Sequence, residues 1–490
     1  MSKKIYKTPG VYVEEVSFRS LSIAQVETAI PAFIGYTEKA EANNQSLLHQ
    51  PTKVNSFLEF QDYYGGEYTP KFELIPASSG DPNSISIANR SLCVQLKPNQ
   101  RTYLFQAIDD FFNNGGVACY VVSVGTYAGE KEIVIKKEEL LGISNSSGLR
   151  ALEDFREPSI LVIPDAVALG RECHDIYREM LSHCKKEGNR FSIFDIYNGF
   201  EERNTSNDCI DQFRNEIGSR DLSYGAAYYP WVDRFESQIP LGFENLDPTI
   251  ELSSILLEQR AQDFLSMSGM TNEDLHKQLV LASPTYRQIL EAMAKKLKAA
   301  PVAGAVAGVY SSTDISRGVW KAPAGDSING FEKPTVALNN AQQEDLNQGG
   351  PVGKSINAIR KFQGRGVVVW GGRTLAGNDN EWRYVSVKRT YLMVEESIKR
   401  GLKAFVFEPN DANTWMQIKG ACDGFLQGLW RQGAFSGTTP KDAYFVKVGL
   451  GKTMTPQDIL EGRLIVEIGM ALVRPAEFIT LRISLKMETP

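Results

Sequence analysis

The 490-residue chain lacks several features that would link it quickly to a known chemistry. It holds no apolar run of the length that a transmembrane helix needs, and its opening residues, Met1 to Tyr6, lack the apolar stretch of a signal peptide. Its formal net charge of −6 gives no electrostatic reason to expect a nucleic acid or an anionic membrane as partner. We therefore expect a chain that is made in the cytoplasm without a signal peptide and that does not insert into a membrane.

Cysteine and histidine are sparse. The six cysteines are scattered and form no CxxC pair, which is typical of free thiols in a reducing compartment. Cys173, His174, His183 and Cys184 hint at a metal site, but on one helix over 167–186 the two pairs would lie about 16 Å apart. One ion cannot bridge that gap, because its ligand distances are about 2.0–2.3 Å. We expect no metal here, but a helix with partly buried thiols and surface imidazoles.

Signals for catalysis are also lacking. There is no G-x-S-x-G elbow to anchor a Ser-His-Asp hydrolase. Gln348 to Ser355 is similar to a phosphate-binding loop, but Gln348 stands where the pattern needs glycine, and Pro351 removes a backbone donor. These departures disfavour an α/β hydrolase or an NTPase, which is the competing class. We expect a structural glycine-rich turn, no cofactor and no enzyme.

What is present is an ordinary globular composition with ordered α/β patterning. Apolar residues make up 42% and charged residues 23%, and the length suggests two to four domains. From residue 157 buried-strand patterns alternate with helical ones, which predicts a parallel sheet. The last part predicts strands at 383–387, 404–407, 444–448 and 464–473, and helices at 389–400 and 413–431, an α+β arrangement. Residues 40–100 and 235–280 are more polar; we expect surface loops or a small insertion in the first and a helical insertion in the second.

The two ends of the chain carry strand patterns. Near the C-terminus Ile479, Leu481, Ile483 and Leu485 alternate with polar residues after Phe478, which is the period of a half-buried strand. The N-terminal strand pattern comprises Val11, Tyr12, Val13, Glu14, Glu15 and Val16. These strands either complete the chain's own sheets or pair with neighbouring subunits. Residues 17–27 lack a helix or strand period, and we expect an extended linker there.

Several stretches in order resemble one family, the sheath proteins of contractile phage tails and contractile injection systems. They are Thr8 to Glu15, Ala29 to Tyr36, Phe112 to Gly116 with Cys119 to Val122, Leu346 to Ile359, Gly366 to Leu375, Tyr384 to Arg389 and Leu426 to Gly433. The ending Arg474 to Leu481 looks like the extracellular injection-system branch. The resemblance runs from Thr8 to Lys486 and is weakest over 40–100 and 235–280.

The resemblance implies a fold and a division of the chain. It implies an α/β middle region with a parallel, subtilisin-like sheet, an α+β C-terminal domain, and extended β arms at both ends. The expected parts are an arm and linker at 1–27, an N-terminal sheath region at 28–156, an α/β domain at 157–375, and a C-terminal domain at 376–490 that ends in an exchanged strand.

The resemblance also implies a structural function. Subunits of this family form hexameric rings that stack helically around an inner tube, with baseplate and terminal cap proteins at the ends. Contraction drives the tube through a target membrane, and the particle is a phage tail-like assembly that acts outside the cell in the extracellular branch. The alternative is a non-contractile shell or baseplate component.

Overall fold

The computed structural model describes residues 22–77, 84–87, 90–144, 146–203, 208–235, 240–349, 353–478 and 480. By its internal contacts the chain divides into two units. The larger comprises residues 27–393 and 473–490, and the smaller comprises residues 1–26 and 394–472. The helix α12, Val385–Leu402, begins in the larger unit and ends in the smaller.

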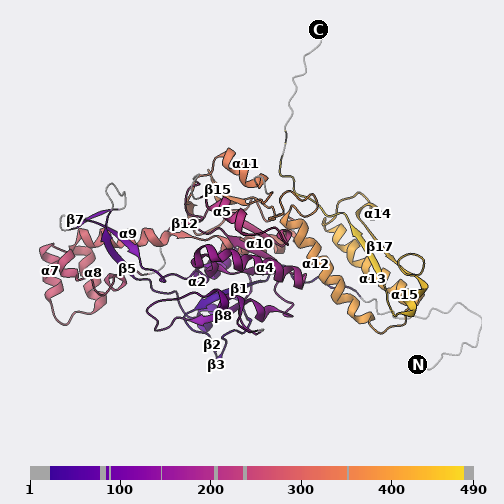
Figure 1. The fold of residues 1–490 in the computed structure, drawn as a ribbon, viewed down its shortest axis with the longest axis horizontal. Coiled ribbons are helices and arrows are strands. Elements are labelled where there is room, and N and C mark those ends of the chain that lie inside the picture. The colour runs from indigo at the N-terminus through magenta and orange to yellow at the C-terminus, as the bar shows by residue number, and fades with distance from the viewer. Residues whose placement is uncertain are drawn as a thin grey trace, which may run out of the picture. The chain divides into compact units, whose positions relative to one another are not determined.

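An eight-stranded, mostly parallel sheet forms the centre of the larger unit (Figure 1). Its strand order is β16-β15-β11-β10-β9-β1-β8-β4, with antiparallel pairing only at the two edges. The strands are β1 (Pro31–Thr37), β4 (Thr52–Val54), β8 (Cys119–Thr126), β9 (Ile160–Val162), β10 (Phe191–Asp195), β11 (Gly225–Tyr229), β15 (Asn357–Phe362) and β16 (Gly366–Trp370). This confirms the coarse prediction of an α/β region with a parallel sheet.

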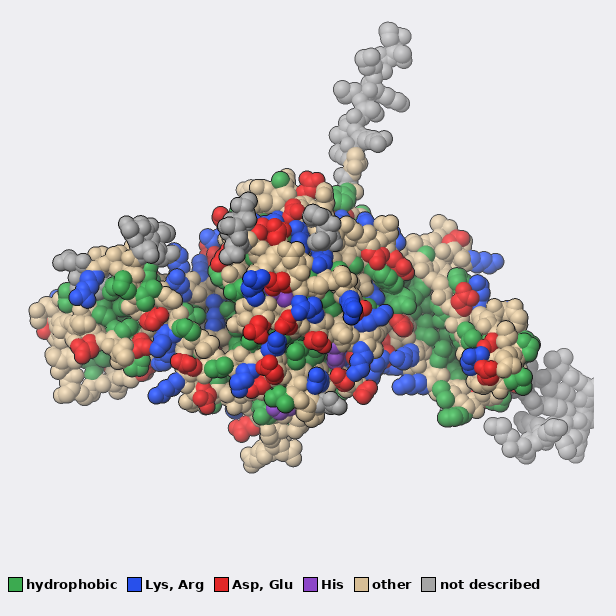
Figure 2. Space-filling model, in the orientation of Figure 1, with side chains coloured by type: hydrophobic (Ala, Val, Ile, Leu, Met, Phe, Trp, Pro, Cys, Tyr) green, Lys and Arg blue, Asp and Glu red, His purple; other side chains and the backbone are tan. Residues whose placement is uncertain are grey.

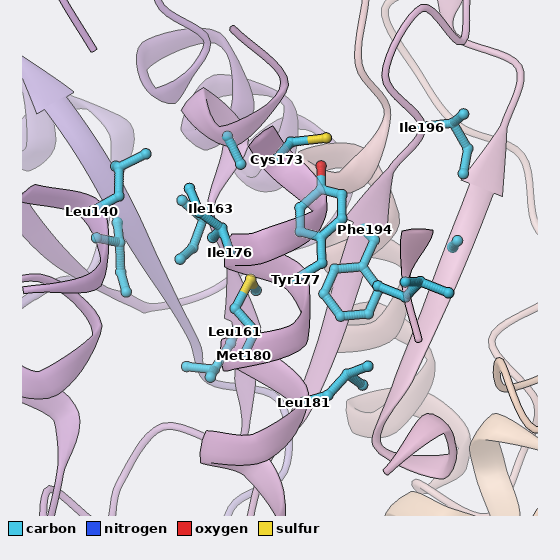
Figure 3. Close-up of a cluster of buried hydrophobic side chains, with 14 of the residues drawn as sticks. Leu140, Leu161, Ile163, Cys173, Ile176, Tyr177, Met180, Leu181, Phe194 and Ile196 are labelled. Atoms are coloured by element: carbon cyan, nitrogen blue, oxygen red, sulfur yellow. The ribbon is translucent and has the colours of Figure 1, made fainter. Parts of the chain in front are cut away.

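Both faces of this sheet are buried, so its strands read as continuous apolar runs. Alternate residues of one strand face opposite sides: Ile34 lies in one core cluster and Phe33 in the other. The helices α4 (Cys173–Glu187) and α5 (Cys209–Glu216) supply the first cluster. In Figure 3, Ile176, Tyr177 and Met180 of α4 lie against side chains of the sheet.

The opposite face is covered by α2 (Leu104–Asn113) and α10 (Ala303–Arg317). These helices pack closely because Gly304 and Gly308 face α2; a Cβ on Gly304 would lie 2.3 Å from the carbonyl oxygen of Ala107. Sequence analysis missed α10, because its run of small residues gives almost no amphipathic period. A helix whose first nine residues are all buried needs no such period.

Two buried carboxylates cap the helices of that face. Asp195, at the end of β10, accepts hydrogen bonds from the backbone N–H groups of Val302 (2.7 Å) and Ala303 (3.0 Å) at the start of α10. Asp165 accepts in the same way from Tyr103 and Leu104 at the start of α2. Each carboxylate satisfies helix donors that would otherwise be buried without partners.

The two polar segments at 40–100 and 235–280 both form regular secondary structure over much of their length. The first forms the antiparallel sheet β5-β7-β6 (Phe72–Pro76, Arg90–Leu96, Ile85–Ile87). Of the two alternatives expected there, surface loops are wrong over this part, and a small insertion stays a prediction. The second is helical, as predicted. It contains α6 (Leu252–Ile255), α7 (Gln259–Ser266) and α8 (Asn272–Ala282), which pack with α9 (Pro284–Lys298) on the β5–β7 sheet as a second core of the larger unit (Figure 1).

Shorter elements complete the larger unit. They are α1 (Phe57–Tyr64), β2 (Glu41–Ala42), β3 (Gln45–Ser46), α3 (Lys137–Leu141), β12 (Val232–Arg234), β13 (Ala299–Ala300), β14 (Phe331–Pro334), α11 (Asn340–Gln348) and the 3-10 segments at 148–152, 164–172, 222–224 and 243–245. The 3-10 segment at 164–172 precedes α4, so the helix predicted over 167–186 begins later than expected.

In the smaller unit the end of α12, the long helix α13 (Ala412–Arg431) and the hairpin β17–β18 (Tyr444–Val448, Val466–Met470) dominate, with the short helices α14 (Pro440–Ala443) and α15 (Pro456–Leu460). The helix and strand predictions at 413–431, 444–448 and 464–473 are confirmed.

Two predicted strands of this region are wrong. Residues 383–387 lead into α12, where burial on nearly all sides suits Val385 and Val387 in a helix. Residues 404–407 form a 3-10 turn, Lys403–Phe405, followed by an exposed loop in which Phe407 has a positive φ of 74°. That backbone conformation is incompatible with a strand.

Candidate assembly surface

The hairpin β17–β18 is a sheet of only two strands. Its antiparallel register pairs Val446 with Ile468 and Phe445 with Gly469. In the part of the chain that the structure describes, no third strand pairs with β17 or β18, although isolated bridges such as Phe435 with Leu472 lie just beyond the strand ends. The outer edges along both strands could therefore accept a further strand. A two-stranded sheet is marginal by itself, and added strands would stabilise it.

The two faces of the hairpin differ. Val446 and Val448 are buried on the side of α13, and the Tyr444 hydroxyl donates to the backbone carbonyl of Asp423 in that helix (3.2 Å). The other face is exposed: the Phe445 ring covers Gly469, and a Cβ at position 469 would lie 2.2 Å from that ring. The helix thus fixes the hairpin from one side and leaves its edges open.

The opposite face also carries charge. The Lys447 ammonium lies 4.4 Å from the centre of the Phe445 ring and 3.6 Å from a carboxylate oxygen of Glu467 on the facing strand. Both charged side chains are about half exposed, so their ion pair contributes little to stability.

The last described residues are tied to the larger unit by a side-chain clamp. The Arg373 guanidinium donates to both carboxylate oxygens of Glu477, with Nε–Oε1 at 2.9 Å and Nη2–Oε2 at 2.6 Å. The Tyr384 hydroxyl donates to the same carboxylate at 3.2 Å. Such a two-point pair fixes direction as well as distance.

Two further hydrogen bonds fix the position of Arg373 itself. Its Nη1 donates to the carbonyl of Asn347 (2.8 Å), and its backbone N–H donates to the Asn357 side-chain oxygen (2.8 Å). Asn357, at the start of β15, is fully buried and donates in turn to the carbonyls of Arg373 and Ala227. Arg373 and Glu477 lie in separate family-like stretches of the sequence, and their pairing was not predicted, because residues 104 positions apart share no periodic signal.

Most of the predicted inter-subunit strand residues lie outside the described residues. This holds for Val11, Tyr12, Val13, Glu14, Glu15 and Val16 of the N-terminal arm, and for Ile479, Leu481, Ile483 and Leu485 of the C-terminal arm. Phe478 is described, and its side chain is 76% exposed directly after the Glu477 clamp. Their role in assembly stays a prediction.

The glycine-rich turn near residue 350 offers no free lysine to a phosphate. Lys354 is buried, and its ammonium donates to the backbone carbonyl of Arg214. Burial lowers its pKa. Gly349, with φ of 74°, ends α11 as a left-handed cap.

The histidine–cysteine helix is a core element. Cys173, His174, His183 and Cys184 are all buried in α4, so the prediction of surface imidazoles was wrong. Burial and the Arg190 guanidinium, which lies 2.9 Å from His183, lower the pKa of His183 to about 3. Among the described residues no group of three or more acidic, histidine or cysteine side chains is placed to hold a metal ion. Within the same residues no helix is long and apolar enough to cross a membrane.

Two family models match this chain. The model described as the phage tail sheath protein central domain matches residues 276–375, and the phage tail sheath C-terminal domain matches residues 377–486. Among curated proteins, the tail sheath protein of Vibrio phage KVP40 is 26% identical over 185 residues, which is 37% of this chain and 26% of that protein. The tail sheath protein of Salmonella phage ViI is 24% identical over 28% of this chain and 22% of that protein. The match thus spans about a quarter of each curated relative.

Solved structures match over nearly the whole chain. The sheath complex of the extracellular contractile injection system PVC, in its contracted state, is 26% identical with a TM-score of 0.60 over 99% of both chains. The contracted helical sheath of the anti-feeding prophage is 27% identical with a TM-score of 0.61 over 98% of this chain and 99% of that one. A chain of the anti-feeding prophage baseplate is 28% identical with a TM-score of 0.60 over 99% and 100%.

Proposed function

Because this chain belongs to the contractile tail sheath family, we propose that it is the structural subunit of a contractile sheath. In this proposal copies form hexameric rings that stack helically around an inner tube, and contraction drives the tube through a target membrane. The likeness over nearly the whole chain to the sheath of the extracellular contractile injection system PVC and to the helical sheath of the anti-feeding prophage supports the proposal. The particle would be phage tail-like and act outside the cell.

The observation that carries the assembly mechanism is the open hairpin of the smaller unit. Among the described residues no third strand pairs with β17 or β18, whereas Glu477 is bound by Arg373 in the larger unit, at the start of the C-terminal segment. Residues from Phe478 onward can therefore add to the β17–β18 sheet of a neighbour, and Val11–Val16 of another subunit can add to the remaining edge. Main-chain pairing joins the subunits without requiring one rigid interface between their bodies.

The proposed division of the chain follows from this mechanism. Residues 1–27 serve as arm and linker, 28–156 and 157–375 as the body, and 376–490 as the connecting domain with its exchanged strand. A subtilisin-like middle sheet in this proposal carries no chemistry, because the fold alone does not supply a catalytic site.

A second candidate is a baseplate or non-contractile shell component. The likeness to a chain of the anti-feeding prophage baseplate favours it. In that case short ring assemblies form, but long tubes do not. Inner tube, baseplate and terminal cap proteins are the proposed partners in either case.

The decisive experiment expresses the full chain with and without residues 477–490, together with its inner tube protein. We expect the full chain to form long tubes by negative-stain electron microscopy and the truncated chain to stay a folded monomer by light scattering. Full-length tubes from the truncated chain would refute strand exchange. Rings without tubes from the full chain would favour the baseplate alternative.

A further inference from the structure

A cavity of about 690 Å³ lies in the larger unit, at one edge of the central sheet. Three of its lining residues follow neighbouring strands: Ala168 follows β9, Phe200 follows β10 and Trp231 follows β11. These strands run parallel, so all three residues lie beyond the carboxyl ends of their strands. Open α/β sheets bind ligands at this edge, and the volume is typical of ligand pockets, which measure about 300–1,000 Å³.

One wall of the cavity is a fixed group of three aromatic rings. The Tyr103 and Phe200 rings meet the Trp231 ring edge to face, with ring centres 5.7 Å and 5.2 Å away. The Trp231 indole donates to the carbonyl of Ile196 (2.8 Å), and its backbone N–H donates to the carbonyl of Gly199 (2.9 Å). Trp231 is buried, whereas the Phe200 side chain is 41% exposed. The cavity therefore presents a pre-positioned aromatic surface to a partner.

The lining of the cavity carries charge of one sign. Among the described residues that line it none is acidic, and four are basic: Lys97, Arg101, Lys295 and Lys296. Lys295 and Lys296 are exposed near the end of α9, where Figure 2 shows basic side chains beside the central part of the larger unit. Lys97 pairs with Asp247, which does not line the cavity, at an N–O distance of 2.5 Å. The other three basic side chains make the cavity positive, which favours an anionic occupant.

The Arg101 side chain is fixed in the wall of the cavity. Its guanidinium donates to the carbonyls of Leu297 (3.1 Å) and Ala299 (2.6 Å) near the end of α9. The same group lies 4.8 Å from the centre of the Tyr103 ring. Positive charge and the aromatic wall are therefore adjacent, and an occupant that combines a carboxylate with an apolar ring contacts both.

A second cavity, of about 570 Å³, adjoins the first and has the opposite balance of charge. The two cavities share Lys97 and Gln100 in their linings. Three basic side chains line the second cavity together with five acidic ones, which are Glu38, Glu67, Glu130, Glu132 and Asp247. A nucleic-acid strand that filled the first cavity would carry its phosphates toward these carboxylates and be repelled. A polypeptide can change the sign of its charge from one residue to the next.

We propose that the basic cavity binds an acidic segment of a partner protein, in which an aromatic residue stands beside one or more carboxylates. The aromatic side chain packs on Phe200, and the carboxylates lie against Lys295 and Lys296. Basic residues that follow in the partner segment lie over the acidic cavity. This inference goes beyond the proposed sheath function and does not depend on exchanged strands, because all residues that line the basic cavity lie between positions 95 and 299.

Calorimetry of the dilute, unassembled chain with a synthetic peptide tests the proposal. The probe is the peptide Asp-Glu-Phe-Glu-Gly-Lys-Lys with both ends blocked, and the comparison peptide has alanine in place of phenylalanine. We expect saturable binding of the probe that weakens as salt is raised, because the contacts are partly ionic. The comparison peptide should bind about tenfold more weakly, as expected when an aromatic anchor is truncated. No saturable heat at millimolar probe, or equal binding of the two peptides, would overturn the proposal.

Two variants test whether the peptide occupies this cavity. Phe200→Ser and Lys296→Glu should each weaken probe binding about tenfold, the scale of a lost anchor or a reversed charge at an interface. Phe235→Ser and Lys452→Glu are the matched controls, because both residues are exposed and neither lines the cavity. Lys296 is exposed, so Lys296→Glu should fold even if melting shows that Phe200→Ser does not. Wild-type affinity in Lys296→Glu would overturn the proposal.

Two further titrations distinguish other occupants. They use a single-stranded oligothymidylate of the same length as the probe, and phenylacetate. We expect neither to reach the affinity of the probe. If the oligothymidylate binds as tightly as the probe and Lys296→Glu weakens it, the cavity is a site for polyanions and the assignment to a protein segment is wrong. Phenylacetate that binds as tightly as the probe would indicate a small-molecule site and overturn the assignment in the same way.

Discussion

Arg373 grips the carboxylate of Glu477 through two nitrogens, with Tyr384 as a third donor. The arginine side chain is 11% exposed and the glutamate side chain 20%, so solvent screens this pair less than an ion pair on an open surface. The clamp sits on the loop that leads from β16 to α12, and the chain continues from it into the predicted exchanged strand. It holds the chain at Glu477, two residues before the predicted strand pattern begins at Ile479.

Releasing the clamp should impair assembly more than folding. In Glu477→Ala the arginine keeps its bond to Asn347, so we expect a loss of about 1–3 kcal/mol in unfolding free energy. We expect tube yield to fall severely, because the C-terminal segment loses its fixed starting point. Thermal melting and negative-stain counts of tubes measure the two effects.

Glu461→Ala is the matched control for this experiment. Glu461 also pairs with an arginine, Arg463, but on an exposed surface of the smaller unit. It should change neither melting nor tube yield. Normal tubes from Glu477→Ala would show that the clamp is dispensable and that the strand finds its partner unaided.

The glycine-rich turn should bind no nucleotide. Lys354→Met replaces a buried ammonium by an apolar chain of similar length, so the lost bond to the Arg214 carbonyl is offset by removal of a buried charge. We expect the melting temperature to shift by only a few degrees. Calorimetry with ATP at millimolar concentration should show no saturable heat for either protein, and saturable binding that Lys354→Met abolishes would restore the NTPase alternative.

The elements that sequence analysis placed correctly are those whose pattern is local. α13 was predicted at 413–431 because it keeps an apolar period over its twenty residues. The hairpin strand β17 alternates because only one face packs on α13. In each case the order of apolar and polar side chains within the element follows which of its faces is buried, so the element can be predicted from its own residues.

The elements that sequence analysis misplaced depend on partners far along the chain. α10 is built from small residues because α2 lies against it, and the strand-like opening of α12 is helical because it is buried all round. The Arg373–Glu477 clamp needs β15 to position Asn357 behind it. A residue pattern records that a side chain is apolar or charged, but not which distant group meets it.

The contribution of Asp195 to the stability of the chain should fall as pH rises through the acidic range. Burial raises the pKa of Asp195 to about 7, although two backbone N–H groups oppose this shift. A folded-state pKa above the unfolded value means that the folded state holds its proton more tightly. The contribution is therefore greatest at low pH and is lost progressively between about pH 4 and pH 7.

Asp195→Asn isolates this contribution. The asparagine oxygen can still accept from Val302 and Ala303, but it does not ionise. We expect wild type to lose about 2–3 kcal/mol more than the variant between pH 5 and pH 8. Denaturant melts of both proteins at the two pH values measure this difference. Parallel pH profiles would show that Asp195 stays ionised throughout, held by its two donors and the α10 dipole.

Two sets of helical glycines should respond in opposite ways to alanine. In α10 a Cβ on Gly304 would meet the backbone of Ala107, so Gly304→Ala must push α10 away from α2 and should cost about 1–3 kcal/mol. In α13 Gly420 and Gly424 are exposed, and a Cβ on either meets nothing within 4 Å. Alanine there restricts the unfolded chain and should stabilise it by about 0.5–1 kcal/mol per site.

Melting of the unassembled chain measures both changes, and tube formation gives a second reading. If Gly420→Ala/Gly424→Ala raises the melting temperature and tubes still form, these glycines leave the face of α13 open without a role in subunit contact. If the monomer is more stable but tubes fail, another chain approaches α13 closely enough to exclude a methyl group. Gly304→Ala is the variant that places a new methyl group against the backbone of α2 at Ala107. If this variant stabilised the chain, the close packing of α2 against α10 would be contradicted.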